Sequence, residues 1–363
     1  MSTHHISYAQ LLHRLETSAL TRNENGVETV IKPIPDSDTK GTLDPRVLDV
    51  VLRQRSEEPA TEAETAFSIE AIRAQMGWPN QDVTTSAIRI RSLVLDGEKG
   101  NIPVRVYAPK ADELLPGVIF FHGGGFFGGD LETVEHPCKA LAEKANAVVV
   151  SVDYRLAPEH PFPAGLEDCF EAVKWVHRHA EGLGIAKEKI AVAGDSAGGN
   201  FAAVCAILDQ EQGTDMIKYQ ALIYPVVNLG SIETDDYRWS LAQYDIHEHD
   251  ELIRGIVLSL GESADLFNDI YLQGKTDVTN PFVSPLFHAK MKGLPDALIV
   301  TAEYDYLRLE GEAYARKLAR AGVETRIVQY RGMDHAFIDK LGEYPQAEDC
   351  MNEIAKGLKR VFG

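Results

Sequence analysis

The chain has 363 residues, enough for two or three ordinary domains or for one large α/β domain with an attachment. Its content of 44 % hydrophobic and 25 % charged residues is typical of a globular protein and excludes a disordered chain, a collagen and a coiled-coil rod. A formal net charge of −19, from 36 basic and 55 acidic residues, argues against nucleic acid or anionic lipid as main partner, because phosphate binding depends on Lys and Arg.

The N-terminal residues, the absence of long apolar runs and the cysteines indicate a reducing compartment. The first residues lack the basic and then apolar segments of a secretory signal. No run of 18 apolar residues occurs, so we expect no stable membrane insertion. The four cysteines are scattered without a CxxC pair, which predicts free thiols and no disulfide framework. We therefore expect a cytoplasmic protein.

The N-terminal part, residues 1–85, shows helical spacing of apolar residues and no clear strand. Apolar positions recur at this spacing in residues 8–15, 47–52 and 66–76. This part is predicted to hold a few short helices and no strand-bearing core. The histidines at positions 4 and 5 fall in a terminal segment that we expect to be mobile.

Strand-like runs and helical patterns alternate through the rest of the chain. The runs lie at residues 88–95, 104–107, 118–121, 148–152, 190–193, 221–224, 297–300 and 326–330. The helical patterns lie at residues 166–180, 197–210, 310–321 and 347–361. This alternation predicts an α/β fold with a mostly parallel eight-stranded sheet flanked by helices. Short turns between the first strands predict an antiparallel edge there.

The alternation lapses in residues 227–293, which are polar and hold only short helical stretches. Insertions of this kind tend to lie above the carboxyl ends of the strands, where ligands bind. We expect this insertion to form a helical cap together with residues 1–85. The α/β core would then consist of residues 86–226 and residues 294–363.

A G-x-S-x-G motif centred on Ser196 connects a predicted strand directly to a predicted helix. This context is the one in which the motif forms a sharp turn that exposes the serine hydroxyl. Gly194 and Gly198 are small, as the crowded turn requires. The helix that begins here also directs its first N–H groups to the same place. The motif therefore predicts that Ser196 is a nucleophile.

The strand at residues 118–121 ends in the loop His122-Gly123-Gly124-Gly125. Consecutive glycines leave backbone N–H groups free to approach a developing oxyanion. We expect the N–H groups of Gly124 and Gly125 to act together with that of Ala197, the residue after the nucleophile. His122 is predicted to anchor this loop and not to act as a base.

The same loop also fits the dinucleotide-binding fingerprint G-x-G-x-x-G, with Gly128 as its third glycine and Asp153 as the acidic residue. Three carboxylates that follow the loop would repel a pyrophosphate. These are Asp130, Glu132 and Glu135. We therefore favour an oxyanion hole over a nucleotide site.

A serine nucleophile needs a histidine base and a carboxylate that orients it, and the expected chain order is serine, acid, histidine. His335 lies in a loop after the last predicted strand and suits the base. Asp305 follows the strand before it and is the preferred acid. Glu303 and Asp334 are local alternatives.

Another cluster of polar residues lies within the insertion. His247 and His249, with Asp245 and Asp250, have the composition of a metal site. The stretch is better interpreted as the start of a helix, so we predict no metal.

With these residues in hand, the chain resembles the hormone-sensitive-lipase family of α/β-hydrolase esterases. The matching segments cover roughly residues 85 to 363 and occur in family order. They are HGGG at 122–125, DYRLAPEHPFPA at 153–164, GDSAGGN at 194–200, EYDYLRLEGEAYA at 303–315 and GMDHAF at 332–337. The combination is far more specific than any single segment.

The resemblance implies an α/β-hydrolase fold and a triad of Ser196, Asp305 and His335. It implies the three-donor oxyanion hole described above, with His122, Gly123 and Asp195 as supporting motif residues (the first two in the glycine loop). The implied activity is hydrolysis of short- to medium-chain carboxylic esters through an acyl-enzyme, with a small-molecule ester as substrate and neither cofactor nor metal. The resemblance also allows a homodimer through the last edge strand.

Two alternatives remain open. A lactone or amide hydrolase would use the same triad. A non-catalytic ligand-binding protein on the same scaffold is the other alternative, but the branch of the family with that role lacks the histidine that this chain has at position 335.

Smaller expectations concern the surroundings of the site. Arg155 and Glu159 are expected to pair and to brace the glycine loop. Similar proteins usually have proline after the triad aspartate and an acid four residues beyond it, whereas this chain has Tyr306 and Leu309. Several aromatic residues suggest an apolar cleft. They are Phe126, Phe127, Tyr237, Trp239 and Phe337.

Overall fold

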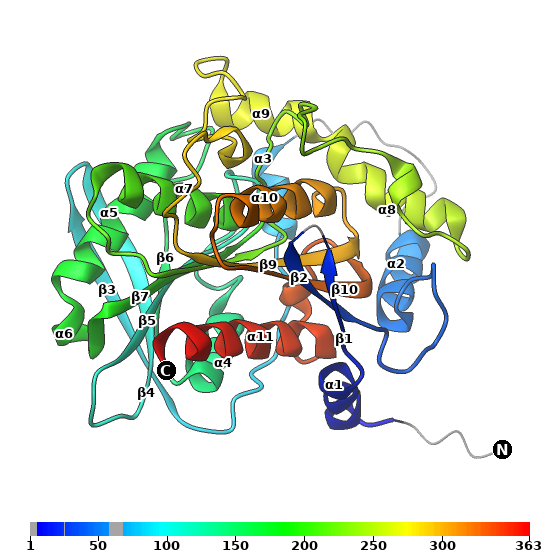
Figure 1. Cartoon of the computed structure of the whole chain (residues 1–363), viewed down its shortest axis with the longest axis horizontal. Coiled ribbons are helices and arrows are strands. Elements are labelled where there is room, and N and C mark those ends of the chain that lie inside the picture. Colours follow the sequence, from blue (N-terminus) through cyan, green and yellow to red (C-terminus); the bar gives the residue numbers. More distant parts are fainter. Residues whose placement is uncertain (1–5, 25, 58–67) are drawn as a thin grey trace.

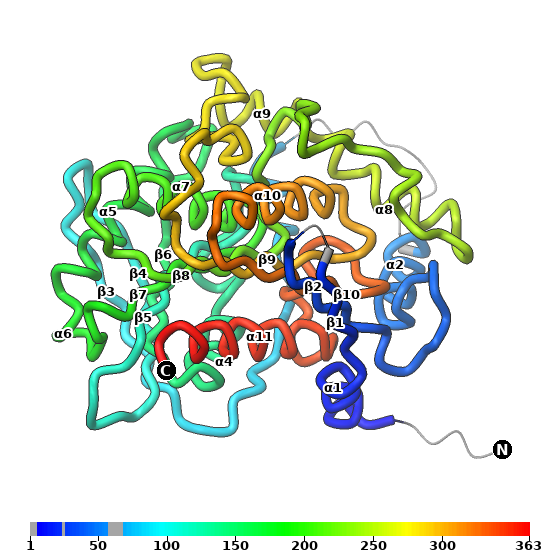
Figure 2. Tube along the Cα trace, viewed as in Figure 1, coloured from blue at the N-terminus to red at the C-terminus, as the bar shows by residue number. Residues whose placement is uncertain are grey.

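The computed structural model describes residues 6–24, 26–57 and 68–363. The histidines at positions 4 and 5 and the first two residues of the helical pattern at 66–76 lie outside this part of the chain. The described residues form one sheet with helices on both faces and a further helical layer above one end (Figures 1 and 2). Both faces of the sheet are therefore covered, as its apolar strands require.

The sheet has ten strands in the order β1-β2-β10-β9-β8-β7-β5-β6-β4-β3. They are β1 (Leu20–Glu24), β2 (Val27–Lys32), β3 (Ile88–Gly97), β4 (Gly100–Pro109), β5 (Leu115–Phe121), β6 (Val148–Val152), β7 (Ile185–Asp195), β8 (Tyr219–Ile223), β9 (Asp296–Tyr304) and β10 (Thr325–Asp334). Each of the eight predicted runs forms one of the strands β3 to β10, and the antiparallel edge is confirmed because β3 pairs with β4 and β4 with β6 in that sense.

The N-terminal part was wrongly expected to hold only helices. Strand β2 lies parallel to β10, and β1 pairs with β2 antiparallel, so residues 20–32 extend the sheet from eight strands to ten. The segment is short and interrupted by Glu28, which pairs with Arg326 of β10 at 2.6 Å, so it has no continuous apolar run. The last predicted strand, β10, is consequently not an edge strand, and the edge at which a homodimer was expected is covered.

Helices cover the two faces of the sheet in separate groups (Figure 1). The group on the side of the insertion is α5 (Ala164–Arg178), α7 (Ala197–Gln212) and α10 (Arg308–Arg320). The opposite group includes α4 (Glu135–Ala145) and α11 (Pro345–Phe362), which pack on each other, and α1 (Tyr8–Thr17), which packs on α11. A one-turn helix, α6 (Ala180–Leu183), precedes β7.

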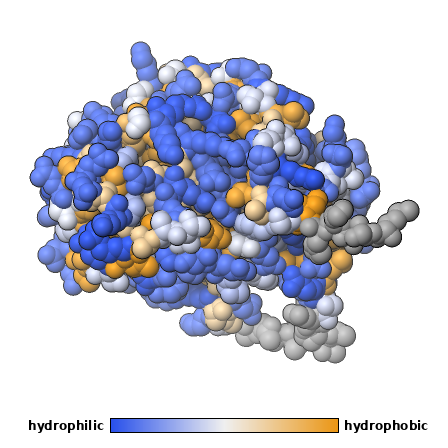
Figure 3. Space-filling view, turned by 90° about the horizontal axis from the view of Figure 1, so that it is seen from below, coloured by the Kyte–Doolittle hydropathy of each residue, from blue (hydrophilic) through white to orange (hydrophobic). Residues whose placement is uncertain are grey.

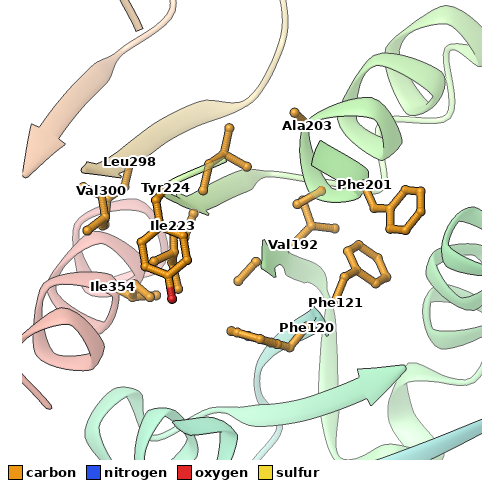
Figure 4. Close-up of a cluster of buried hydrophobic side chains, with 14 of the residues drawn as sticks. Phe120, Phe121, Val192, Phe201, Ala203, Ile223, Tyr224, Leu298, Val300 and Ile354 are labelled. Atoms are coloured by element: carbon orange, nitrogen blue, oxygen red, sulfur yellow. The ribbon is translucent and has the colours of Figure 1, made fainter. Parts of the chain in front are cut away.

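The core lies between the sheet and these helices. Figure 4 shows side chains from β5, β7, β8 and β9 that meet residues of α7 and α11. The labelled residues are Phe120, Phe121, Val192, Phe201, Ala203, Ile223, Tyr224, Leu298, Val300 and Ile354, and all are at most 1 % exposed. The core supports the strands β5, β7, β8, β9 and β10, whose carboxyl ends lie at the same end of the sheet. The loops that carry the predicted site begin there.

The insertion forms α8 (Asp250–Glu262) and α9 (Ala264–Leu272), which form the uppermost layer of Figure 1. Residues of both helices line a cavity together with Ser196 and His335, which directly follow the carboxyl ends of β7 and β10. The N-terminal part contributes α2 (Pro45–Glu57) and α3 (Ile69–Gln75). The two parts touch directly, because the N–H groups of His247 and Glu248 donate to the carbonyl of Gly41 at 2.8 and 3.0 Å. Both also line the cavity described below.

The surface agrees with the composition. Figure 3 shows one face that is mostly hydrophilic, with hydrophobic residues in small separate patches. Within the described residues, no helix has the length and apolar character needed to cross a membrane. All four cysteines are buried and unpaired, as predicted.

Candidate active site

Ser196 occupies a strained turn between β7 and α7. Its φ of 53° and ψ of −115° lie in a region that residues other than glycine rarely adopt. The turn is crowded, since a Cβ on Gly194 would overlap the backbone of Gly198, and a Cβ on Gly198 would overlap the carbonyl of Phe121. The two glycines are therefore required for this turn, and the turn presents the Ser196 hydroxyl at the edge of the sheet.

His335 joins Ser196 to Asp305. The Nε2 atom of His335 lies 3.0 Å from the Ser196 Oγ, and its Nδ1 atom lies 2.7 Å from Oδ2 of Asp305. Burial lowers the pKa of His335, but the charge and hydrogen bond of Asp305 outweigh it, so the pKa is raised above its ordinary value. The imidazole remains 25 % exposed, so its side toward the cavity is accessible.

Asp305 is almost completely buried and is held from several directions. Its Oδ1 accepts the N–H of Leu307 at 2.9 Å, which leaves Oδ2 for the imidazole. The hydroxyl of Tyr244, from the insertion, donates to the Asp305 carbonyl at 2.9 Å. The insertion therefore positions the loop that carries the predicted acid, a role of Tyr244 that no sequence motif indicated.

The structure does not bring the two alternative acids to the imidazole nitrogen. Glu303 forms an ion pair with Arg331 and accepts the N–H of Gly332 at 2.8 Å. Asp334 is half-buried, and its partial removal from water raises its pKa to about 6 despite the nearby Lys340. Asp305 is thus the carboxylate that hydrogen-bonds His335.

The glycine loop lies opposite Ser196. Gly124 has a φ of 125°, and a Cβ there would overlap the backbone of Gly128, so this position requires glycine. Within the described part of the chain, the N–H groups of Gly124 and Gly125 donate no hydrogen bond. Ala197 is the first residue of α7, where N–H groups have no partner within the helix. These three N–H groups are available to a ligand.

His122 and Asp195 hold this loop in place. His122 is fully buried and stacks on Tyr154, with 4.2 Å between ring centroids, and burial lowers its pKa to about 4. This environment suits an anchor better than a base. Asp195 accepts the N–H of Gly123 on Oδ1 at 2.9 Å. Burial and then the charge of Asp339 raise the pKa of Asp195 to about 8.

A cavity of about 300 Å³ opens onto Ser196 and His335. Its wall is mostly apolar and comes from the glycine loop, both cap segments and the loops after β8 and β9. The residues include Met76, Gly77, Gly124, Gly125, Phe126, Phe127, Val226, Leu229, Ser231, Leu260, Ala264, Phe267, Asn268, Tyr306 and Glu310. Of the five aromatic residues expected in a cleft, Phe126 and Phe127 line it, whereas Tyr237, Trp239 and Phe337 do not.

The expected pair of Arg155 and Glu159 does not form. Arg155 binds Asp168 instead, with 2.8 Å between Nε and Oδ2, and Glu159 binds Arg73, which precedes the core in sequence. Local spacing could not reveal a partner 86 residues away. The stretch still supports the glycine loop, because the N–H of Ala157 donates to the carbonyl of Phe126 at 3.0 Å.

The two alternative sites gain no support from the geometry. Six residues separate Gly128 from the start of α4 at Glu135, so the glycine loop does not open a helix as a dinucleotide site requires. His247 pairs with Asp245 at 2.8 Å, and the described residues hold no group of three or more metal-ligating side chains.

Comparison with known proteins identifies the family to which the chain belongs. A family profile described as the alpha/beta hydrolase fold matches residues 118–339, which include the serine turn and both other predicted triad residues. The chain belongs to the α/β-hydrolase family. The resemblance noted from the sequence motifs is thereby confirmed.

Several relatives of this α/β hydrolase are named esterases. Esterase LipI of Mycobacterium tuberculosis is 37 % identical over 335 residues, covering 90 % of this chain and 97 % of that protein. Carboxylesterase NlhH of the same species is 36 % identical, with coverage of 82 % and 91 %. An arylesterase of Saccharolobus solfataricus is 36 % identical, with coverage of 75 % and 83 %.

Solved structures give the same result. An esterase from Pyrobaculum calidifontis is 37 % identical and superimposes with a TM-score of 0.71 over 88 % of this chain and 98 % of its own. A mutant form of the esterase rPPE is 30 % identical with a TM-score of 0.77, over 90 % and 99 % of the two chains. The α/β-hydrolase fold expected from the sequence is confirmed.

Proposed function

We propose that this chain is a serine carboxylesterase in which Ser196, His335 and Asp305 form the catalytic triad. The relationship to named esterases supports hydrolysis of carboxylic esters. The observation that carries the residue assignment is the continuous series of hydrogen bonds from Ser196 through His335 to Asp305. Beside it lie the N–H groups of Gly124, Gly125 and Ala197, which donate to no other group among the described residues.

The first half of the reaction forms an acyl-enzyme. His335 accepts the Ser196 proton on Nε2 as the serine oxygen attacks the ester carbonyl carbon. The carbonyl oxygen becomes an oxyanion, and the N–H groups of Gly124, Gly125 and Ala197 stabilise it. Breakdown of this intermediate breaks the bond to the alcohol oxygen, which leaves with the proton from His335.

The second half hydrolyses the acyl-enzyme. A water molecule gives a proton to His335 and attacks the acyl carbon, and the same N–H groups stabilise the second oxyanion. The Ser196 oxygen then leaves with that proton. Asp305 keeps the imidazole in the tautomer that carries a proton on Nδ1 and stabilises its protonated form.

The cavity accounts for the proposed substrate range. Its volume of about 300 Å³ is at the lower end of ligand pockets, and its wall is mostly apolar. Short- to medium-chain esters fit such a space better than long acyl chains. The triad alone does not determine whether the substrate is an ester, a lactone or an amide, so turnover is measured with substrates of all three classes.

The test measures turnover of p-nitrophenyl butyrate by Ser196→Ala and His335→Ala. Each substitution removes a group that acts in every step, so kcat falls by about 10⁴-fold or more. Ser259→Ala and His13→Ala, at exposed positions, are the matched controls and retain full turnover. Undiminished turnover by folded Ser196→Ala overturns the proposal. A ligand-binding role is favoured instead if the wild-type protein turns over no ester, lactone or amide and does not react with a fluorophosphonate.

A further inference from the structure

The cavity extends to both sides of Ser196. Along the sheet, the glycine loop follows β5, Ser196 follows β7, and the next loops follow β8 and β9. On the β8 and β9 side, five residues of the cavity wall form what we call the β9-side arm. They are Leu229, Ser231, Leu260, Ala264 and Tyr306. Apolar side chains dominate this arm, and its wall includes Leu260 of α8 and Ala264 of α9.

Tyr306 directly follows Asp305 and is the largest side chain of the arm. Its ring stacks on Trp239, with 5.1 Å between centroids and 24° between planes. Its hydroxyl donates to the Oγ of Ser231 at 3.1 Å. These contacts hold the ring on one face and at its hydroxyl group.

The remaining side of the ring rests on helix α8. A Cβ at Gly261 would overlap Cε2 of Tyr306, so the ring lies directly against the helix backbone. The loop after β9 and the cap are therefore in contact at this point. A shorter side chain at position 306 would open the arm toward α8, because glycine at 261 has no side chain that could fill the space.

We propose that Tyr306 is a specificity-determining residue that ends the β9-side arm and limits the substrate group bound there to a short chain. This inference rests on the proposed function and adds to it a residue that sets chain length. The effect is steric: the ring occupies the space that additional methylene groups of a longer ester would need. Each methylene that finds apolar space changes kcat/KM by about tenfold or more.

The experiment compares Tyr306→Ala and Tyr306→Val with the wild-type chain on two ester series. One series lengthens the acyl group of p-nitrophenyl esters from acetate to octanoate, and the other lengthens the alcohol of alkyl acetates, followed by pH-stat. The β9-side arm holds either the acyl group or the alcohol group of the ester. In the corresponding series, the ratio of kcat/KM for the octyl or octanoyl ester to that for the shortest ester rises at least about tenfold in Tyr306→Ala, the effect of one accommodated methylene group, and less in Tyr306→Val.

Two matched variants separate a change of shape from other effects. Tyr306→Phe retains the ring and loses the hydrogen bond to Ser231, so its chain-length profile stays that of the wild type. Leu266→Ala, at a side chain of α9 that is 39 % exposed, also leaves the profile unchanged. Thermal unfolding and titration of active sites with a fluorophosphonate show how much of each variant is folded and competent.

A second measurement tests the contact itself. Gly261→Ala lowers the melting temperature of the wild type, because the added methyl group meets the Tyr306 ring, whereas the same change in Tyr306→Ala has a much smaller effect. The inference is overturned if Tyr306→Ala and Tyr306→Val have the chain-length profile of the wild type in both series. In that case, ester turnover by the wild type still supports the proposed function. An absence of wild-type turnover contradicts the proposed function instead.

Discussion

The Oδ1 atom of Asp195 accepts the N–H of Gly123 at 2.9 Å, so the residue before the proposed nucleophile holds the proposed oxyanion hole. This hydrogen bond links the loop after β5 directly to the turn after β7. Since the oxyanion N–H groups must meet a developing charge within hydrogen-bonding distance, this contact matters for rate more than for substrate binding.

Asp195→Ala is predicted to lower kcat for p-nitrophenyl butyrate by about 10- to 100-fold, with a much smaller effect on KM, because the glycine loop loses its anchor. Asp195→Asn retains an oxygen that accepts the Gly123 N–H and resembles the neutral acid that a pKa of about 8 favours at neutral pH. It should keep most of the activity. Equal losses in the two folded variants would show that charge, and not this hydrogen bond, is what matters.

The pH dependence of kcat/KM should show an acid limb from His335. The imidazole accepts a proton only when neutral, and Asp305 raises its pKa above the ordinary value of 6.5. Activity therefore rises with pH through the region above 6.5 and falls as the imidazole becomes protonated at lower pH. The profile is measured with an uncharged ester on the free enzyme; a flat profile from pH 5 to 8 is incompatible with His335 as base.

Glu310 should make the protein less stable as pH rises. Burial raises its pKa from 4.5 to about 8, although the N–H groups of Val227 and Asn228 on its Oε1 oppose the shift. Between these values the folded state binds a proton that the unfolded chain releases, so the free energy of unfolding falls by at most about 1.4 kcal/mol per pH unit.

Glu310→Gln removes this titration and keeps an oxygen for the two N–H groups. Its melting temperature relative to wild type should therefore increase from pH 5 to pH 8, and other buried acids cancel in the difference. Glu188→Gln, at an exposed position, is the control and shows no such trend. A difference for Glu310→Gln that does not change with pH would refute this account of the carboxyl group.

Lys32, the last residue of β2, attaches the hairpin of β1 and β2 to helix α11. Its ammonium group is 1 % exposed and lies 2.8 Å from carboxylate oxygens of both Asp349 and Glu353 on α11. Lys32→Met removes the ammonium partner of buried Asp349, whereas Glu353 keeps its ion pairs with Arg326 and Lys356. The unpaired carboxylate of Asp349 should destabilise the protein by about 3–5 kcal/mol in urea unfolding. Lys356→Met, whose side chain is 43 % exposed, should cost no more than about 1 kcal/mol. Similar losses for the two variants would exclude a special role of the buried pair.

The sequence predicted those features of the fold and site that depend on neighbouring residues. The turn at Ser196 needs Gly194 and Gly198 two residues away, and the order of strands and helices follows from apolar runs. Asp305 is preferred over Glu303 and Asp334 from the sequence because it lies further into the loop after its strand. In the structure its Oδ2 lies 2.7 Å from Nδ1 of His335.

Features that depend on distant partners could not be predicted. Strand β2 is stabilised by pairing with β10 and by its last residue, Lys32, which forms ion pairs with α11. Neither contact leaves a local pattern in residues 27–32. Arg155 pairs with Asp168 because the turn into α5 places Oδ2 of Asp168 2.8 Å from Nε of Arg155. Tyr306 was noted as a departure from similar proteins, but its contact with Gly261 requires the position of α8 in space.

The most direct test of the central claim is to locate the acyl group on the enzyme. The protein is mixed with p-nitrophenyl acetate, quenched in acid within the first turnovers and digested for mass spectrometry, with a fluorophosphonate-treated sample for comparison. We predict an acetyl group and the phosphonate on the peptide containing Ser196, and neither modification in Ser196→Ala. Modification of a different residue, or ester turnover in Ser196→Ala at the wild-type rate, would contradict the account.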